Sequence, residues 1–130
     1  MSNIALDFQA LTQVGSMLGS GAVVALAEGT CMLDAALNVV TFFRNESCGK
    51  CVPCRIGSQK LAGLGNHLLS RQITKQRWEN ELLPVIKDLN EVLSLTSICG
   101  LGRSVPVPLR TVVEFFPDDL NKHLAGNGKA

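Results

Sequence analysis

Apolar residues recur at helical spacing along most of the chain after position 30. The first such stretch predicts a helix from Thr30, a residue type that caps helix N-termini well, to about Asn45. Its spacing places one continuous apolar face toward a core. That face is formed by Leu33, Ala36 or Leu37, Val40 and Phe43.

Three further helical stretches follow this one. The second contains Gly57, Gly63 and Gly65, and each glycine costs a helix up to about 1 kcal/mol relative to alanine. We therefore expect close packing against another backbone to compensate. Pro84 either kinks the third stretch or starts a new helix there. The predicted ranges are Pro53 to about Ser70, Thr74 to about Leu93, and Leu109 to about Leu124 with an interruption at Pro117.

Extended structure is predicted at two places. Residues 22–26 form a continuous apolar run typical of a buried strand, and the Val-Pro-Val-Pro run at 105–108 predicts an extended segment. The glycine-rich residues 15–21 lack a following lysine and helix, which favours a tight turn over a phosphate-binding loop. Together these patterns predict a mainly α, four-helix-bundle-like domain with a short N-terminal extended, glycine-rich segment. The expected divisions are an extension at 1–29, a helical domain at 30–125 and a tail at 126–130.

Composition narrows the class of protein. The 130 residues are 46% hydrophobic and carry a net charge of +1, which excludes a disordered tail and a strongly basic nucleic-acid binder. No apolar run reaches the length of a membrane span, so we expect no direct membrane insertion. The N-terminal residues lack the pattern of a secretory signal. We expect a cytoplasmic location, which includes the cytoplasmic side of a membrane complex.

The cysteines are the most informative residues. Three of the five, Cys48, Cys51 and Cys54, follow one another at two-residue gaps. Cys99 is far enough along the chain for one helix to lead away from these three and a second helix to return to the same end of the bundle. In a reducing compartment this clustering indicates metal binding rather than disulfides. Successive thiolates at such gaps suit a polynuclear iron–sulfur cluster, for which Cys99 is the expected fourth ligand.

Other uses of these cysteines remain open. Zinc is disfavoured because a four-cysteine zinc site usually takes two separate Cys-x-x-Cys knuckles. A three-ligand radical-type cluster would leave Cys99 unused. A cysteine nucleophile would need a base, and neither His67 nor His123 is near the triple in sequence. We expect both histidines to be solvated, and we expect Cys31, in an apolar stretch, to be a small buried hydrophobe rather than a ligand.

Two motifs resemble a known family. They are Glu46-Ser47-Cys48-Gly49-Lys50-Cys51-Val52-Pro53-Cys54-Arg55 and Ser97-Ile98-Cys99-Gly100-Leu101-Gly102, preceded by the glycine-rich residues 15–21. Between Leu6 and Leu124 the chain resembles the C-terminal third of the NADH- and FMN-binding flavoprotein subunit of bacterial respiratory complex I. NAD-dependent formate dehydrogenases and NAD-linked hydrogenases share this subunit.

The resemblance implies a helical bundle that binds one [4Fe-4S] cluster through Cys48, Cys51, Cys54 and Cys99. It implies an electron relay between FMN and further iron–sulfur centres, with a flavin-binding domain and other iron–sulfur subunits as partners. The family's FMN and NAD site lies in a preceding α/β domain, so we expect this chain alone to bind neither and not to turn over. Residues 6–26 are expected to pack against that domain in the full protein. The alternative is a zinc-bearing or apo structural and docking module.

Overall fold

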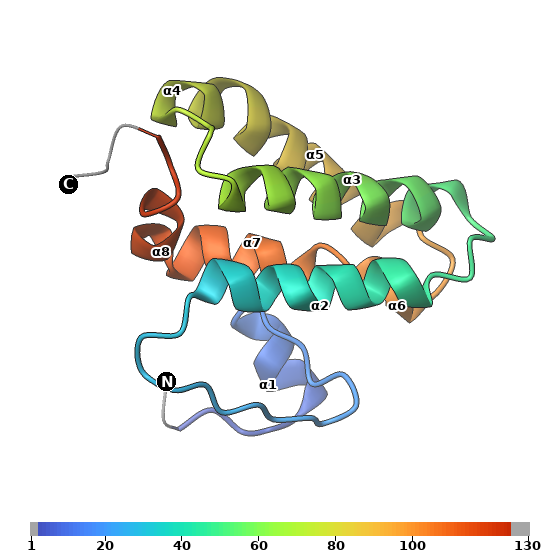
Figure 1. The fold of residues 1–130 in the computed structure, drawn as a ribbon. Coiled ribbons are helices and arrows are strands. Elements are labelled where there is room, and N and C mark those ends of the chain that lie inside the picture. The colour runs from blue at the N-terminus through green and yellow to red at the C-terminus, as the bar shows by residue number, and fades with distance from the viewer. Residues whose placement is uncertain (1–2, 126–130) are drawn as a thin grey trace. The chain divides into compact units, whose positions relative to one another are not determined.

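The computed structural model describes residues 3–125 and is mainly α, as predicted (Figure 1). The chain divides after Thr30 into two compact units. Within the described residues there is no strand, and no helix is long and apolar enough to cross a membrane. The elements are α1 (Phe8–Gln13), α2 (Met32–Glu46), α3 (Val52–Leu69), α4 (Lys75–Arg77), the π-helix η1 (Trp78–Leu82), α5 (Leu83–Thr96), α6 (Gly100–Ser104), α7 (Val107–Phe115) and α8 (Pro117–Asn121).

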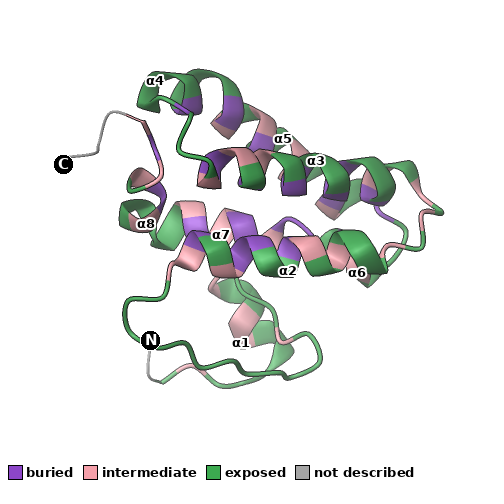
Figure 2. Cartoon of the chain, viewed as in Figure 1, coloured by how far each residue is buried: buried purple, intermediate pink, exposed green. Residues whose placement is uncertain are grey.

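The second unit is organised around a ring of its four longest helices. Helix α2 packs against α3 and α7, and α5 also packs against both α3 and α7. Their inward faces are buried (Figure 2). Each fully buried leucine contributes about 1.5–3 kcal/mol relative to an exposed one, so this core holds the ring together. The fully buried side chains on these helices include Leu33, Val40, Leu61, Leu68, Leu93 and Leu109.

The N-cap of helix α2 lies one residue later than predicted, so the helix begins at Met32. Cys31, not Thr30, occupies the N-cap position, and its side chain makes no capping hydrogen bond. Instead, the backbone N–H of Met32 donates to the carboxylate Oδ2 of Asp119 in α8 at 3.0 Å. A carboxylate from a distant helix therefore takes over the capping role that a local side chain usually fills.

Pro84 begins a new helical segment, one of the two outcomes predicted for it. The turn before it is a π-helix, in which the N–H of Leu83 donates to the carbonyl of Trp78. A proline lacks an N–H and its ring clashes with the carbonyl four residues earlier in a regular α-helix. The wider π turn therefore accommodates Pro84 without ending the helical rod.

Two predictions of extended structure are wrong. Residues 22–26 form no strand; they are exposed, with Val23 81% and Val24 78% accessible. An apolar run becomes a strand only beside a partner strand, and residues 3–125 supply none. The Val-Pro-Val-Pro run is the start of α7, with Pro106 at its N-cap and Pro108 in its first turn. Proline is tolerated there because the first N–H groups of a helix have no partner to lose. The predicted tail at 126–130 lies outside the described residues.

Close packing compensates two of the three helical glycines. A methyl group at Gly57 would lie 2.9–3.1 Å from three side-chain carbons of Leu93 in α5. At Gly65 it would lie 2.5 Å from Leu37 Cδ1 in α2. Gly63 faces open space. Gly57 thus allows α5, and Gly65 allows α2, to approach the backbone of α3 closely.

These contacts predict opposite effects of two matched substitutions. Gly57→Ala should lower the free energy of unfolding by about 1–2 kcal/mol, because overpacking a buried leucine outweighs the gain in helix propensity. Gly63→Ala should raise it by up to about 1 kcal/mol. Urea unfolding followed by far-ultraviolet circular dichroism measures both. Equal effects of the two changes would contradict the close α3–α5 contact.

Candidate metal centre

The loop between α2 and α3 carries the first part of the cysteine motif. It turns at Gly49, whose φ of +72° is a conformation that other residues rarely adopt. The N–H of Gly49 donates to Ser47 Oγ at 3.3 Å, which holds the turn against the end of α2. Cys48, just before the turn, is exposed.

The second part of the motif begins helix α3. Cys51 is the N-cap residue and is half-buried, and Cys54 lies in the first turn and is buried. Ser47 Oγ lies 3.3 Å from Cys54 Sγ. Pro53 follows the N-cap, where its missing N–H costs nothing. Local helix geometry therefore aims two of the four predicted ligands at the same end of the bundle.

The loop between α5 and α6 packs against this first turn. A methyl group at Gly102 would lie 2.6 Å from Ser97 Cβ and Oγ and 3.0 Å from Cys54 Cβ. Only a glycine fits between these two side chains. The loop is further fixed by Arg103 Nε, which donates to the carbonyl of Ser97 at 3.2 Å. Cys99, inside this loop, is the N-cap residue of α6.

A main-chain hydrogen bond joins the two segments directly. The backbone of Ile98, next to Cys99, hydrogen-bonds to the Cys51 sulfur and is the largest cause that lowers the pKa of the Cys51 thiol below its ordinary value. The backbone of Cys54 lowers that pKa further, and desolvation opposes both. Donors that stabilise a thiolate also suit a metal ligand, since thiolate is the form that binds metal.

The structure therefore brings the segment of Cys99 to Cys51 and Cys54, while Cys48 and Cys99 themselves are exposed. All four are free thiols. Among residues 3–125, no three cysteine, histidine or acidic side chains converge closely on one point where a metal ion could sit. The donor chemistry nevertheless fits an iron–sulfur cluster, whose ligands are cysteine thiolates from one end of the fold.

Comparison with known proteins decides the family. Residues 34–123 match the family described as "NADH-ubiquinone oxidoreductase-F iron-sulfur binding region". The chain belongs to this family. Membership supports a [4Fe-4S] cluster as the cofactor of this iron–sulfur binding region, and so favours the iron–sulfur interpretation of the cysteines over the zinc alternative.

Relatives of this iron–sulfur binding region are subunits of larger enzymes. It is 35% identical over 122 residues to the NADP-reducing hydrogenase subunit HndC of Solidesulfovibrio fructosivorans, covering 94% of this chain and 24% of that protein. It is 34% identical to an NADH-quinone oxidoreductase subunit of Aquifex aeolicus, covering 81% of this chain and 24% of that protein. The chain thus spans about a quarter of these relatives.

A solved structure shares the fold as well. The crystal structure of an NAD+-reducing [NiFe]-hydrogenase in the H2-reduced state superposes with a TM-score of 0.66 at 28% identity. The match covers 75% of this iron–sulfur binding region and 16% of the hydrogenase chain.

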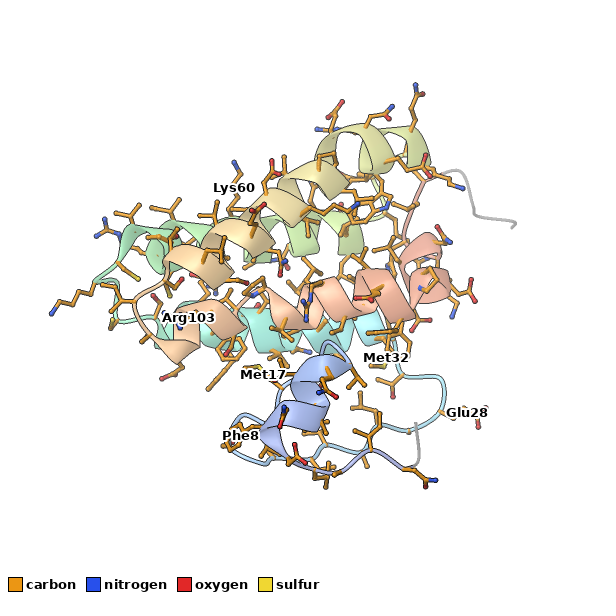
Figure 3. All side chains as sticks on the ribbon, turned by 180° about the vertical axis from the view of Figure 1, so that it is seen from behind. Phe8, Met17, Glu28, Met32, Lys60 and Arg103 are labelled. Atoms are coloured by element: carbon orange, nitrogen blue, oxygen red, sulfur yellow. The ribbon has the colours of Figure 1, made fainter. Side chains whose placement is uncertain are left out.

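The opposite end of the bundle contains a polar cluster that sequence reasoning missed. Cys31 Sγ lies 3.2 Å from His123 Nε2. Cys31 is half-buried and packs against the core, as predicted for a small hydrophobe, but it also has a polar partner that the prediction lacked. The prediction that His123 is solvated is wrong, since its ring is partly buried. Figure 3 shows Met32 and Arg103 toward opposite ends of the bundle. Cys31 and His123 are separated by most of the domain in sequence, so spacing gave no signal for their contact.

Asp119 and Lys122 complete this cluster. Lys122 Nζ donates to Asp119 Oδ1 at 2.7 Å, and this hydrogen bond is the first cause that lowers the pKa of Asp119, followed by the Met32 N–H. Desolvation, and then the charge of Arg71, lower the pKa of His123. His123 Nδ1 is buried and makes no hydrogen bond within residues 3–125. Both causes of the lowered pKa favour the neutral form of the His123 ring.

The lowered pKa predicts a loss of stability in mild acid. Below about pH 6.5 the unfolded chain protonates this histidine while the folded chain does not, so the free energy of unfolding should fall until the folded pKa is reached. His123→Gln should show a shallower decrease than the unaltered protein between pH 7 and 5.5. Urea unfolding of both proteins at several pH values tests this. Parallel curves for the two proteins would contradict the assignment.

Proposed function

We propose that this chain carries one [4Fe-4S] cluster on Cys48, Cys51, Cys54 and Cys99 and relays single electrons within an NAD-linked oxidoreductase. The observation that carries the proposal is the packing of the α5–α6 loop on the first turn of α3, which brings the segment of the remote cysteine to the triple. Family membership and the oxidoreductase relatives support the same role.

The protein's own residues hold and orient the ligands. Ser47 spans the α2–α3 turn, since its Oγ accepts from the Gly49 N–H and contacts Cys54 Sγ. Arg103 fixes the loop that carries Cys99. When bound, the cluster supplies a one-electron carrier. We assign no acid–base or nucleophilic step to any of these side chains.

Electrons would arrive from a flavin and leave to another iron–sulfur centre. We infer an FMN donor from the resemblance of both motifs to the family of flavoprotein subunits, together with the NADH-quinone oxidoreductase and hydrogenase relatives. The flavin and nicotinamide sites belong, in this proposal, to a glycine-rich α/β domain other than the helical bundle.

An exposed apolar surface near the cysteines is the candidate docking face for a partner iron–sulfur protein. Val52 and Ile56 are one turn apart on α3 and are 60% and 51% exposed. Leu95 and Ile98, at the end of α5 and in the following loop, are 72% and 71% exposed. Exposed large apolar side chains are typical of interaction sites, and these lie close in sequence to the proposed ligands, where electron transfer requires a partner.

Iron and sulfide analysis tests the cluster and its ligands. After anaerobic reconstitution we expect about four irons and four acid-labile sulfides per chain. Cys99→Ala should leave a degraded or three-iron cluster and a lower unfolding temperature, because ligation joins two distant segments and so contributes to folding stability. Thermal melts with parallel recording of cluster absorbance measure both effects.

Cys31→Ala is the matched control for this experiment. It removes a thiol from the opposite end of the bundle and should keep the full cluster, at a cost within the range of about 0.5–3 kcal/mol common for point substitutions. One zinc without sulfide, or an unaltered melt and absorbance in Cys99→Ala, would rule out the proposed ligation.

The proposed electron relay is tested in the assembled enzyme that co-purifies with this chain. With Cys99→Ala, NADH should still bleach the flavin absorbance, whereas electron delivery to the downstream iron–sulfur centres should fall by at least about tenfold. Stopped-flow absorbance and freeze-quench electron paramagnetic resonance follow the two steps. Unchanged reduction of the downstream centres would show that electrons bypass this cluster.

A further inference from the structure

Ser97 has a buried hydroxyl that the fold leaves without a partner. The residue is 2% exposed, and its Oγ makes no hydrogen bond within the described part of the chain. Both main-chain groups are satisfied: its N–H donates to the Leu93 carbonyl, and its carbonyl accepts from Arg103 Nε. A buried hydroxyl left unpaired costs about 1–3 kcal/mol, so this one calls for an acceptor.

The hydroxyl lies at the predicted ligands. Ser97 Oγ and Cys54 Cβ border the same small space at Gly102, 2.6 Å and 3.0 Å from the position of a methyl group there. Ser97 is two residues before Cys99, in the loop whose Ile98 backbone hydrogen-bonds to the Cys51 sulfur. Its side chain therefore lies near Cys54 and in the loop that carries Cys99, beside two of the four proposed thiolates.

From this placement, and resting on the proposed function, we propose that the Ser97 hydroxyl donates a hydrogen bond to a sulfur of the bound cluster or its Cys54 thiolate and raises the reduction potential. A cluster with four thiolate ligands gains negative charge on reduction. A donor aimed at its sulfurs therefore stabilises the reduced state more than the oxidised state. Ser97 is a positioning and tuning residue, not a ligand.

Ser58 provides a matched control within the same domain. It is fully buried and its Oγ also lacks a hydrogen bond among the described residues, but it lies one helical turn further along α3 than Cys54 and is not among the atoms nearest to Gly102. A change to alanine at either serine removes the same atom from an equally buried place. Only the change at Ser97 should alter the cluster.

The experiment is a redox titration of the anaerobically reconstituted chain, monitored by electron paramagnetic resonance. Ser97→Ala should retain the iron and sulfide content and be harder to reduce. At the midpoint potential of the unaltered protein, the ratio of reduced to oxidised cluster should fall about tenfold, which corresponds to about 59 mV for one electron. Ser58→Ala should titrate like the unaltered protein.

Each other result has a distinct meaning. An unchanged potential in Ser97→Ala overturns the inference and leaves the proposed function intact, as does an equal shift in Ser58→Ala, which would indicate a general packing effect. Loss of the cluster in Ser97→Ala also overturns it, because a residue that only tunes the potential leaves ligation in place. Absence of a cluster from the unaltered chain would instead refute the proposed function.

Discussion

The contact of Gly102 with Ser97 and Cys54 is the constraint on which the metal centre depends. The side chains of Ser97 in the α5–α6 loop and Cys54 in α3 meet at Gly102, where a Cβ atom would lie 2.6 Å from the first and 3.0 Å from the second. A larger residue there would push the α5–α6 loop away from α3. The proposed fourth ligand would then move away from the other three, although no ligand had been changed.

A second glycine contact sets the spacing of α3 and α5, the helix that precedes the α5–α6 loop. Gly57 follows Cys54 by one turn on α3, and Leu93, whose carbonyl accepts from the Ser97 N–H, precedes Ser97 by one turn on α5. The close approach of Leu93 to the α3 backbone therefore fixes the register in which the two cysteine segments meet. Core packing and the geometry of the proposed metal centre thus both depend on glycines that let neighbouring segments approach α3 closely.

The spacing of apolar residues was sufficient to predict α2 and α3, the helices on either side of the cysteine loop, because each buries one regular apolar face. The cysteine spacing likewise predicted an iron–sulfur centre without any structure, and family membership supports a [4Fe-4S] cluster as the cofactor. Sequence reasoning was wrong where the outcome depended on distant partners. The apolar run at 22–26 has no neighbouring strand among residues 3–125, and prolines 106 and 108 serve to start a helix rather than to extend the chain.

The two ends of the bundle differ in how their side chains are paired. At one end Asp119 caps α2, Lys122 pairs with Asp119, and Cys31 pairs with His123 Nε2, although His123 Nδ1 is buried without a partner within residues 3–125. At the other end two cysteines are exposed, a serine hydroxyl lacks a partner within residues 3–125, and large apolar side chains face solvent. Polar groups that a fold buries without partners cost stability, and exposed apolar surface gains by being covered. In the function proposed above, a cofactor and a neighbouring protein would cover the cysteine end, whereas the histidine end is held by contacts within the chain itself.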